Sequence, residues 1–545
     1  MRIILGGATA VVIIAMVLWF GAQHQARSDA FPRFSDTGSA EERGAAAFVG
    51  ADFGGLSMAA LQSHAVPWKL VTAALVLDAV DRDPALPIST DTRDAVLASY
   101  GFLVGSQVQN LPEGVHHRPD DVPLGITHGM ITPLAGMPVQ VANLGCAACH
   151  AGVTYRADGR PNPNAAWIGM PNTSLNLEAY TQGIFAALKT NSGKADQLMA
   201  AVENLYPDTG WRERQTLRRI TLPLVRARLD QIPGDRALPF LNGVPGSTNG
   251  VAALKPVFGT PFLGDGLADA GIVSIPDLGH RHWRNSLLAD GAYALPRTLR
   301  QGPTDATDNT PDKRAALATM TTFFTVPSMG VHPDTALTAV PIAQDIFEFL
   351  DKAYTPQPYP APIDPSRAQQ GRIIYHRDCS SCHGTYNTAP QNGHPTLISF
   401  PNWLGDVGTD SLRADTFTDE LVASFAATPY RDQIAVAQTG AYAAPPLDGI
   451  WASAPYLHNG SVPTLWHLLT PETRPDRFEL GGHMLDFERL GILLENEGYP
   501  ADYIPFSTPV LLDTSKPGLG NDGHEFGADL NEVEKAALLE FLKQL

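Results

Sequence analysis

Cysteine is scarce in this chain, which has only four among 545 residues. All four lie in two short stretches of the form Cys-x-x-Cys-His, at residues 146–150 and 379–383. Because no thiol occurs elsewhere, a disulfide scaffold of the kind found in small secreted proteins is excluded. The same scarcity argues against a zinc protein, in which Cys and His ligands gather in larger sets.

Positive charge is also scarce. Lys and Arg number 38 against 56 Asp and Glu, which gives a formal net charge of −18 at pH 7. Nucleic-acid binding depends on clustered Lys and Arg, so nucleic acid is not expected as a partner. An acidic surface suits a basic or neutral protein partner, or serves solubility alone.

The two Cys-x-x-Cys-His stretches have the attachment pattern of a c-type haem. Two thiols form thioether bonds to the porphyrin, and the adjacent histidine is the proximal ligand of the iron. The sequence therefore predicts two covalently bound c-type haems. The predicted attachment and iron-binding residues are Cys146, Cys149, His150, Cys379, Cys382 and His383.

An apolar run covers residues 3–22, after Arg2 and before a polar segment at residues 23–29. Such a run is an export signal that is either cleaved or kept as a membrane anchor. Its length fits a spanning helix, and no clear cleavage site follows, which favours an inner-membrane anchor. Both alternatives place the body of the protein in the periplasm or another extracytoplasmic space, where c-type haem is attached.

Helical patterns occur at both ends of the chain and before the second motif. They cover residues 40–49, 67–81, 175–189 and 342–354, a segment capped by Asp364 that leads into Cys379, and residues 531–545 with a capping box at Asn531 and Glu534. Prolines at residues 356–362 mark the clearest domain boundary. The prediction is a mainly α fold of two cytochrome c-like haem domains in series, with long loop-rich insertions. Its parts are a signal or anchor (1–28), an N-terminal haem domain with insertions (29–355) and a C-terminal cytochrome c domain (356–545).

The role of each haem depends on the sixth position of its iron. A protein ligand there makes the haem an electron relay, whereas an open position admits peroxide or dioxygen. For the second motif the strongest candidate ligand is His458, in a turn-forming segment at residues 454–461 (APYLHNGS). The alternative is a loop histidine held by backbone groups, and weaker candidates are Met484, His394, His467 and His483.

The first motif has no outstanding distal ligand. His116, His117, His128, Met130, Met137 and Met170 are near enough in sequence to be considered, but packing or solvation is the commoner role for such residues. A cluster of His280, His282 and Trp283 could line a distal pocket, bridge the two haems or simply pack. The six arginines of residues 212–228 face either haem propionates or solvent.

Several segments resemble the bacterial di-haem cytochrome c peroxidase superfamily, and within it the branch that includes the rubber oxygenases. The resemblance is carried by residues 359–386, 407–410 (VGTD), 446–465 (PLDGIWASAPYLHNGSVPTL), 474–481 and 523–545, and in the first half only by residues 123–126 and the first motif. It implies that His458 is the distal ligand of a bis-histidine, electron-transferring C-terminal haem, and that the N-terminal haem is the open, reactive one. A Trp-Asp-Gly-Asn run expected in many members of the branch is absent, with residues 288–291 (LADG) the nearest piece, which leaves substrate and reaction open.

The leading hypothesis is an exported di-haem oxidoreductase of the peroxidase-like type. In it the His150 haem reacts with peroxide or dioxygen, and the His383/His458 haem relays electrons from a redox partner protein or a small-molecule donor. One alternative is a pure electron-transfer cytochrome with both haems six-coordinate. Another is a haem dioxygenase that cleaves an apolar substrate.

Overall fold

The structure is a computed structural model, and it describes most of the chain. The described residues are 38–50, 65–115, 122–134, 136–264, 266, 268–296, 298, 302–303, 309–329, 332–387, 396–494 and 499–545. The predicted export segment and three of the candidate ligands, His116, His117 and His394, lie outside them. Within the described part of the chain, no helix is both long enough and apolar enough to span a membrane.

Helices are the main regular elements. The longer ones are α2 (Ala40–Val49), α4 (Trp68–Arg82), α5 (Thr90–Ser99), α7 (Leu177–Asn191), α8 (Ala195–Leu205), α10 (Leu222–Leu229), α11 (Gly250–Phe258), α12 (Pro311–Ser328), α14 (Val340–Lys352), α15 (Pro365–Asp378) and α20 (Glu532–Leu542). The shorter ones are α6 (Cys146–Cys149), α9 (Trp211–Thr216), α13 (Pro333–Ala336), α16 (Ser380–His383), α17 (Leu412–Asp415), α18 (Asp419–Phe425) and α19 (Leu465–Leu468).

Strands form small sheets of two or three members. The three-stranded sheets are β1 (Val66–Pro67), β4 (Met137–Leu144) and β3 (Ile126–Leu134); β2 (Gln107–Val108), β6 (Pro161–Ile168) and β5 (Ala151–Tyr155); and β14 (Ala435–Val436), β10 (Tyr293–Ala294) and β9 (Ser286–Leu287). The two-stranded ones are β7 (Ser247–Thr248) with β8 (Val273–Ser274), β11 (Thr385–Asn387) with β12 (Thr396–Ser399), β13 (Leu404–Gly405) with β15 (Tyr442–Ala443), β16 (Arg477–Leu480) with β19 (Val510–Asp513), and β17 (Leu485–Asp486) with β18 (Gly491–Ile492).

The prediction of a mainly α fold is wrong. The structure is about 40% helix and 15% strand, so it is a mixed α/β fold with several small sheets. Long loops must find partners for their backbone N–H and C=O groups, and here many of them pair as short antiparallel ladders. A strand of two residues is too short to show alternating hydrophobicity, so the sequence pattern could not reveal it.

The predicted helices with strong capping signals are confirmed. Asp364 accepts hydrogen bonds from the backbone N–H groups of Ser366 and Arg367 and begins α15. Asn531 and Glu534 form the expected capping box at the start of α20. The division of the chain at residue 355 stays a prediction, and the largest hydrophobic cluster takes residues from both sides of it, from Ala45 to Leu545.

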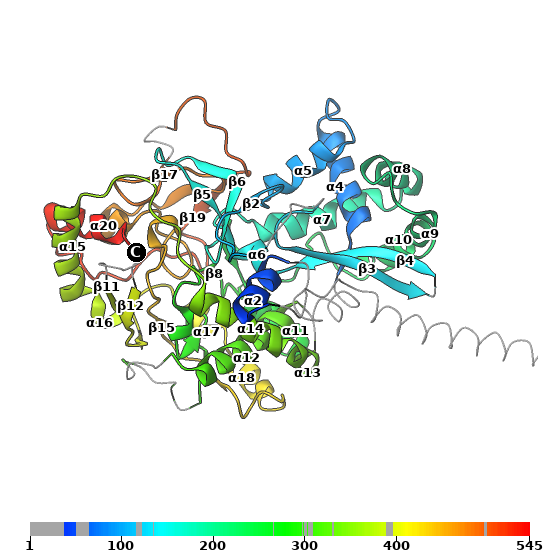
Figure 1. Ribbon diagram of the computed structural model, residues 1–545. Helices are drawn as coiled ribbons and strands as arrows, with labels where there is room; N and C mark the ends of the chain where they lie inside the picture. The colour runs from blue at the N-terminus through cyan, green and yellow to red at the C-terminus, as the bar shows by residue number, and fades with distance from the viewer. Residues whose placement is uncertain are drawn as a thin grey trace, which may run out of the picture.

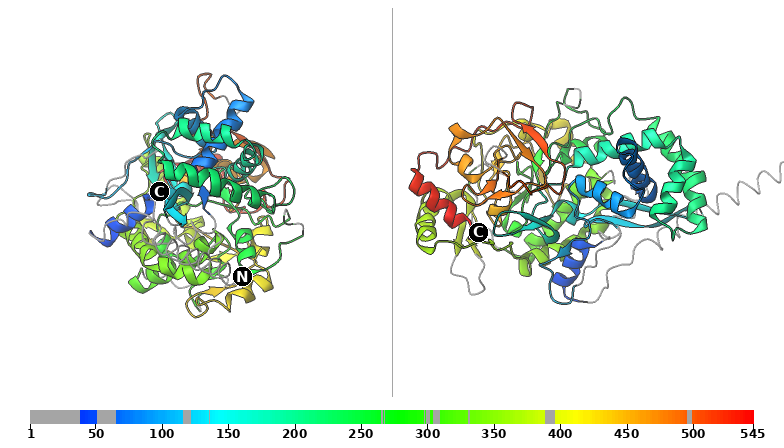
Figure 2. Two further views of the ribbon diagram at one scale, coloured as in Figure 1. Left: turned by 90° about the vertical axis from the view of Figure 1, so that its right-hand side faces the viewer. Right: turned by 90° about the horizontal axis from the view of Figure 1, so that it is seen from above.

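The helices gather in three places (Figure 1). α4, α5 and α7 to α10 lie at one end of the molecule beside the β3–β4 hairpin, whereas α15 and α20 lie together at the opposite end. α2, α11, α12 and α14 form a group between them, and the view from above places the red C-terminal helix α20 and the green α7 to α10 at opposite ends (Figure 2). Each Cys-x-x-Cys-His motif coincides with a short helix, α6 after the hairpin and α16 directly after α15.

Close backbone contacts fix the surroundings of both motifs. Gly125 has φ +80°, and a Cβ there would lie 1.8 Å from the backbone nitrogen of Ala148 inside the first motif. In α15, a Cβ on Gly371 would lie 1.9 Å from the carbonyl oxygen of Ala537 in α20. Only glycine therefore permits α15 and α20 to cross this closely ahead of the second motif.

We expect Gly371→Ala to destabilise the protein by about 1–3 kcal/mol, because the added methyl group forces the two backbones apart. The measurement is the free energy of unfolding from a urea titration. Gly193→Ala is the matched control, since nothing lies within 4 Å of its Cβ position, and it should change the value by less than about 0.5 kcal/mol. Equal effects of the two substitutions would contradict the close crossing.

Candidate functional site

A single large cavity connects the two motifs. Its volume is about 1430 Å³, and its walls include Cys146, Cys149 and His150 together with Cys379, Cys382 and His383. Pockets for one small ligand usually measure about 300–1,000 Å³, so this cavity has room for more than one ligand. Among the described residues, the other histidines that line it are His332, His458 and His524.

The first motif holds its histidine by a backbone hydrogen bond. His150 Nδ1 lies 3.1 Å from the carbonyl oxygen of Pro276, to which it donates. Burial lowers the pKa of His150 to about 4, so the ring is neutral and Nε2 keeps its lone pair. A histidine that donates Nδ1–H to a carbonyl in this way is oriented to bind a metal through Nε2.

The second motif repeats this arrangement. His383 Nδ1 lies 2.9 Å from the carbonyl oxygen of Pro445, and burial lowers the pKa of His383. α15 leads into the motif, and the Tyr375 hydroxyl donates to the carbonyl oxygen of Gly384 at 2.9 Å, which fixes the exit of the chain. All four cysteines are free, so their sulfur atoms are available for attachment.

Two further histidines line the cavity, and one of them, His524, lies beside the second motif. The ring of His458 stacks on Tyr442 with 4.2 Å between ring centres, and its buried Nε2 has no hydrogen-bond partner among the described residues. Burial and then Arg413 lower the pKa of His458 to about 3. His524 has its ring centre 6.1 Å from that of His383, and burial is the main cause that lowers its pKa to about 4.

Sequence reasoning missed His524. It has φ 49°, and its backbone N–H donates to the carbonyl oxygen of Val407 at 2.7 Å, so the chain presents its ring from a strained turn. The available signal was its position between Gly523 and Gly527, within a segment that carries the family resemblance. Glycine-flanked histidines in a loop are otherwise common, so this signal alone was weak.

The remaining candidate ligands do not line the cavity. On the side of the first motif, His128 contacts Gln140, Met130 and Met137 are exposed, and Met170 packs in the core against Gly152. On the side of the second motif, His467 pairs with Thr464, His483 contacts the backbone N–H of Gly481, and Met484 is buried in the core. These residues therefore have structural roles in the described part of the chain.

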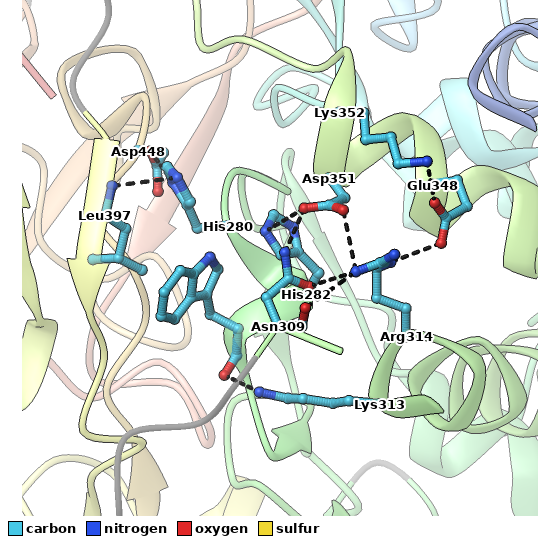
Figure 3. Close-up of polar contacts among 11 residues, drawn as sticks. His280, His282, Asn309, Lys313, Arg314, Glu348, Asp351, Lys352, Leu397 and Asp448 are labelled. Carbon is cyan, nitrogen blue, oxygen red and sulfur yellow. Dashed lines mark hydrogen bonds and ion pairs between the residues drawn. The ribbon is translucent and has the colours of Figure 1, made fainter. Parts of the chain in front are cut away.

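His280 and His282 do not line the cavity, and their rings are bound to carboxylates (Figure 3). His280 Nδ1 lies 2.7 Å from Asp448, and the backbone N–H of Leu397 donates to its Nε2 at 3.4 Å. His282 Nε2 lies 3.3 Å from Asp351. Because these rings are bound within the protein, they connect loops rather than provide distal ligands.

Arginines supply positive charge inside the cavity. Arg281 and Arg284 line it and donate to the carbonyl oxygens of Asp277 and Leu288, and neither has a carboxylate within ion-pair distance in the described residues. Burial lowers the pKa of Arg284 to about 9. Arg413 is paired with Asp290 at 3.2 Å, yet its Nη2 has no hydrogen-bond partner there. A buried cation without a bonded anion is costly, so Arg281 and Arg284, which donate only to carbonyls, and the free Nη2 of Arg413 fit the propionates of a haem.

The basic segment at residues 212–228 contributes little to this charge. Arg228 is its one arginine on the cavity wall, whereas Arg214 and Arg218 pair with Glu203 and Asp196 on the surface. Most of the segment is thus a solvated helix face, the second of the two alternatives drawn from the sequence.

The family comparison agrees with this chemistry. Residues 441–479 match the family model described as RoxA-like, cytochrome c-like. The segment is cytochrome c-like. It contains Pro445, which binds His383, and also His458, so the match relates the second motif to the rubber-oxygenase-like cytochromes c and implies a covalent c-type haem with iron. Kinship with the wider di-haem peroxidase superfamily stays a prediction.

Two proteins of Sinorhizobium fredii (strain NBRC 101917 / NGR234) are similar to this chain. Uncharacterized protein y4iM is 33% identical over 210 residues, which cover 33% of this chain and 45% of that protein. Uncharacterized protein y4iJ is 24% identical over 530 residues, which cover 82% of this chain and 84% of that protein. The match thus spans less than half of the first relative and most of the second.

Proposed function

We propose that this protein is a di-haem c-type cytochrome with oxidoreductase activity, in which the His150 site is reactive and the His383 site relays electrons. The observation that carries the proposal is the shared cavity, in which both proximal histidines are fixed in the same way. A haem supplies one-electron chemistry and, where its sixth position is open, a site for peroxide or dioxygen.

The two sites differ in what faces the proximal histidine. His383 faces the ring of His524, whereas the described residues provide no such ring for His150. Two further histidines line the cavity: His332, which is largely exposed and lies 3.5 Å from Asp334, and His458, whose ring stacks on Tyr442. The difference supports an open first site and a ligated second site.

The proposal includes a redox partner and a location outside the cytoplasm. A one-electron donor, either a redox protein or a small molecule, delivers electrons at the second motif, in which Ser381 is exposed, whereas every residue of the first motif is buried or half-buried. The protein works outside the cytoplasm, because c-type haem is attached there, and the apolar N-terminal segment exports or anchors it.

An oxygenase acting on an apolar substrate is the second candidate function. The cavity wall includes Leu177, Leu238, Phe240, Val251 and Leu254, which would contact an apolar chain. The part of the wall formed by α12 is less apolar than these residues. Thr321, Phe324, Thr325 and Ser328 lie on one face of the helix and line the cavity together. The hydroxyls of Thr321 and Ser328 donate to carbonyl oxygens of α12 itself, so this face offers a substrate mainly hydrogen-bond acceptors.

Carbon monoxide added to the reduced holoprotein, or cyanide added to the oxidised holoprotein, tests the reactive site. We expect one of the two haems to change its absorption spectrum, because one sixth position is open. If neither changes, the protein is a pure electron carrier. Peroxide consumption with a reduced donor then separates a peroxidase from an oxygenase.

The sixth ligand of the second site has two contenders. Two imidazoles on opposite sides of one metal, with metal–nitrogen distances of about 2.0 Å, have their ring centres roughly 6 Å apart. The 6.1 Å between His383 and His524 agrees with this spacing. No ring contact places His458 beside His383 in the described residues, and the ring of His458 stacks on Tyr442 instead. We propose His524 as the ligand, and the sequence-based assignment of His458 stays its competitor.

His524→Ala should convert the second haem from low spin to high spin, because it removes a nitrogen ligand. His458→Ala should leave the haem low spin and change only its surroundings. Electron paramagnetic resonance or absorption spectra of the two variants decide between them. A high-spin signal in His458→Ala with an unchanged His524→Ala would restore the sequence-based assignment.

A further inference from the structure

Two loops that hold the proximal histidines also meet each other. Pro276, whose carbonyl oxygen binds His150, precedes Asp277, and Pro445, whose carbonyl oxygen binds His383, lies three residues before Asp448. Both Asp277 and Asp448 line the cavity. The two haem sites are therefore joined through a pair of buried carboxylates.

Glycines bring the loops into contact. A Cβ on Gly279 would lie 2.3 Å from the Cβ of Asp448, and a Cβ on Gly449 would lie 2.6 Å from Oδ2 of Asp277. Each carboxylate thus packs against the glycine of the other loop. A side chain at either glycine would push the two carboxylates apart.

Each carboxylate has its own hydrogen-bond donors. The hydroxyl of Tyr354 donates to both oxygens of Asp277, at 2.9 and 3.1 Å, and the backbone N–H of Gly279 donates to Oδ1 at 2.7 Å. Asp448 binds His280 Nδ1 at 2.7 Å, as Figure 3 shows, and accepts from the hydroxyl of Tyr386 at 3.3 Å. Asp448 is therefore compensated by a histidine, whereas Asp277 has neutral donors only.

The charge balance makes Asp277 the group that exchanges a proton. The titratable groups that face the pair are His280, Arg281, Tyr354, Tyr375 and Tyr386. Burial, opposed by the Gly279 hydrogen bond and reinforced by Asp448, raises the pKa of Asp277 to about 7. Burial lowers the pKa of His280, but Asp448 and, after it, Asp277 and Asp351 outweigh burial and raise the value overall. At neutral pH the pair thus gains or loses one proton easily.

We propose that Asp277 and Asp448 form a proton-binding site shared by the two haem sites, and that its occupancy is linked to their reduction. The inference rests on the proposed di-haem function. When a one-electron donor reduces either haem, one proton from water adds to the Asp277 carboxylate, and it leaves again on oxidation. An added negative charge nearby favours the protonated form of a buried carboxylate, and proton uptake keeps the net charge of the interior constant.

The test is a spectroelectrochemical titration of both haems in the holoprotein between about pH 6 and pH 9. In the wild type, the equilibrium constant for haem reduction should fall up to tenfold for each unit by which the pH rises, around and above neutrality. For a one-electron couple this corresponds to a fall in reduction potential of about 59 mV per pH unit. In Asp277→Asn this slope should be lost. Asp196→Asn, a surface control with an 86% exposed side chain, should keep it. A retained slope in Asp277→Asn, or a flat wild type, would overturn the proposal.

A second variant covers the case in which Asp277→Asn does not fold. Tyr354→Phe removes a donor that stabilises the charged carboxylate, so the pH at which the slope begins should move upward. If the pH at which the slope begins does not change, the proposal is also overturned, because a merely structural role of Tyr354 predicts no such shift. The haem content distinguishes a failure of the proposed function from a failure of this inference. A wild type without two haems contradicts the proposed function, whereas two haems with no linked proton contradict only this inference.

Discussion

The whole arrangement depends on two hydrogen bonds, from His150 Nδ1 to the Pro276 carbonyl and from His383 Nδ1 to the Pro445 carbonyl. Each bond fixes the tautomer and the direction of an imidazole, and burial keeps the ring neutral, so the lone pair of Nε2 is free to bind a metal. Since both carbonyls belong to loops that meet at Asp277 and Asp448, the position of one histidine is mechanically tied to that of the other.

Burial then decides the electrostatics of the interior. A cavity of low polarity makes unpaired charge costly, and Arg281 and Arg284 donate hydrogen bonds only to backbone carbonyls among the described residues. Carboxylates of a haem would neutralise them. The same burial shifts Asp277 to a pKa of about 7, so one physical cause accounts both for the cofactor fit and for a group that titrates near neutral pH.

Local signals determined what could be predicted from the sequence. The Asp364 cap of α15 and the Asn531–Glu534 box of α20 act through adjacent residues, and both helices formed where expected. The mainly α fold was wrong, because two-residue strands such as β9 and β10 form through tertiary contact and leave no periodic pattern. The placement of His524 near His383, and the contact of Asp277 with Gly449, join segments far apart in the chain, which no local pattern encodes.

The central claim is that one cavity holds two covalently attached haems, one for each motif. The most direct measurement is the mass of the purified holoprotein, together with its haem content from the pyridine haemochrome spectrum. The account predicts two haems per chain, with one remaining when Cys146 and Cys149 are both replaced by serine. A single haem in the wild type, or an unchanged haem content after that double replacement, would contradict it.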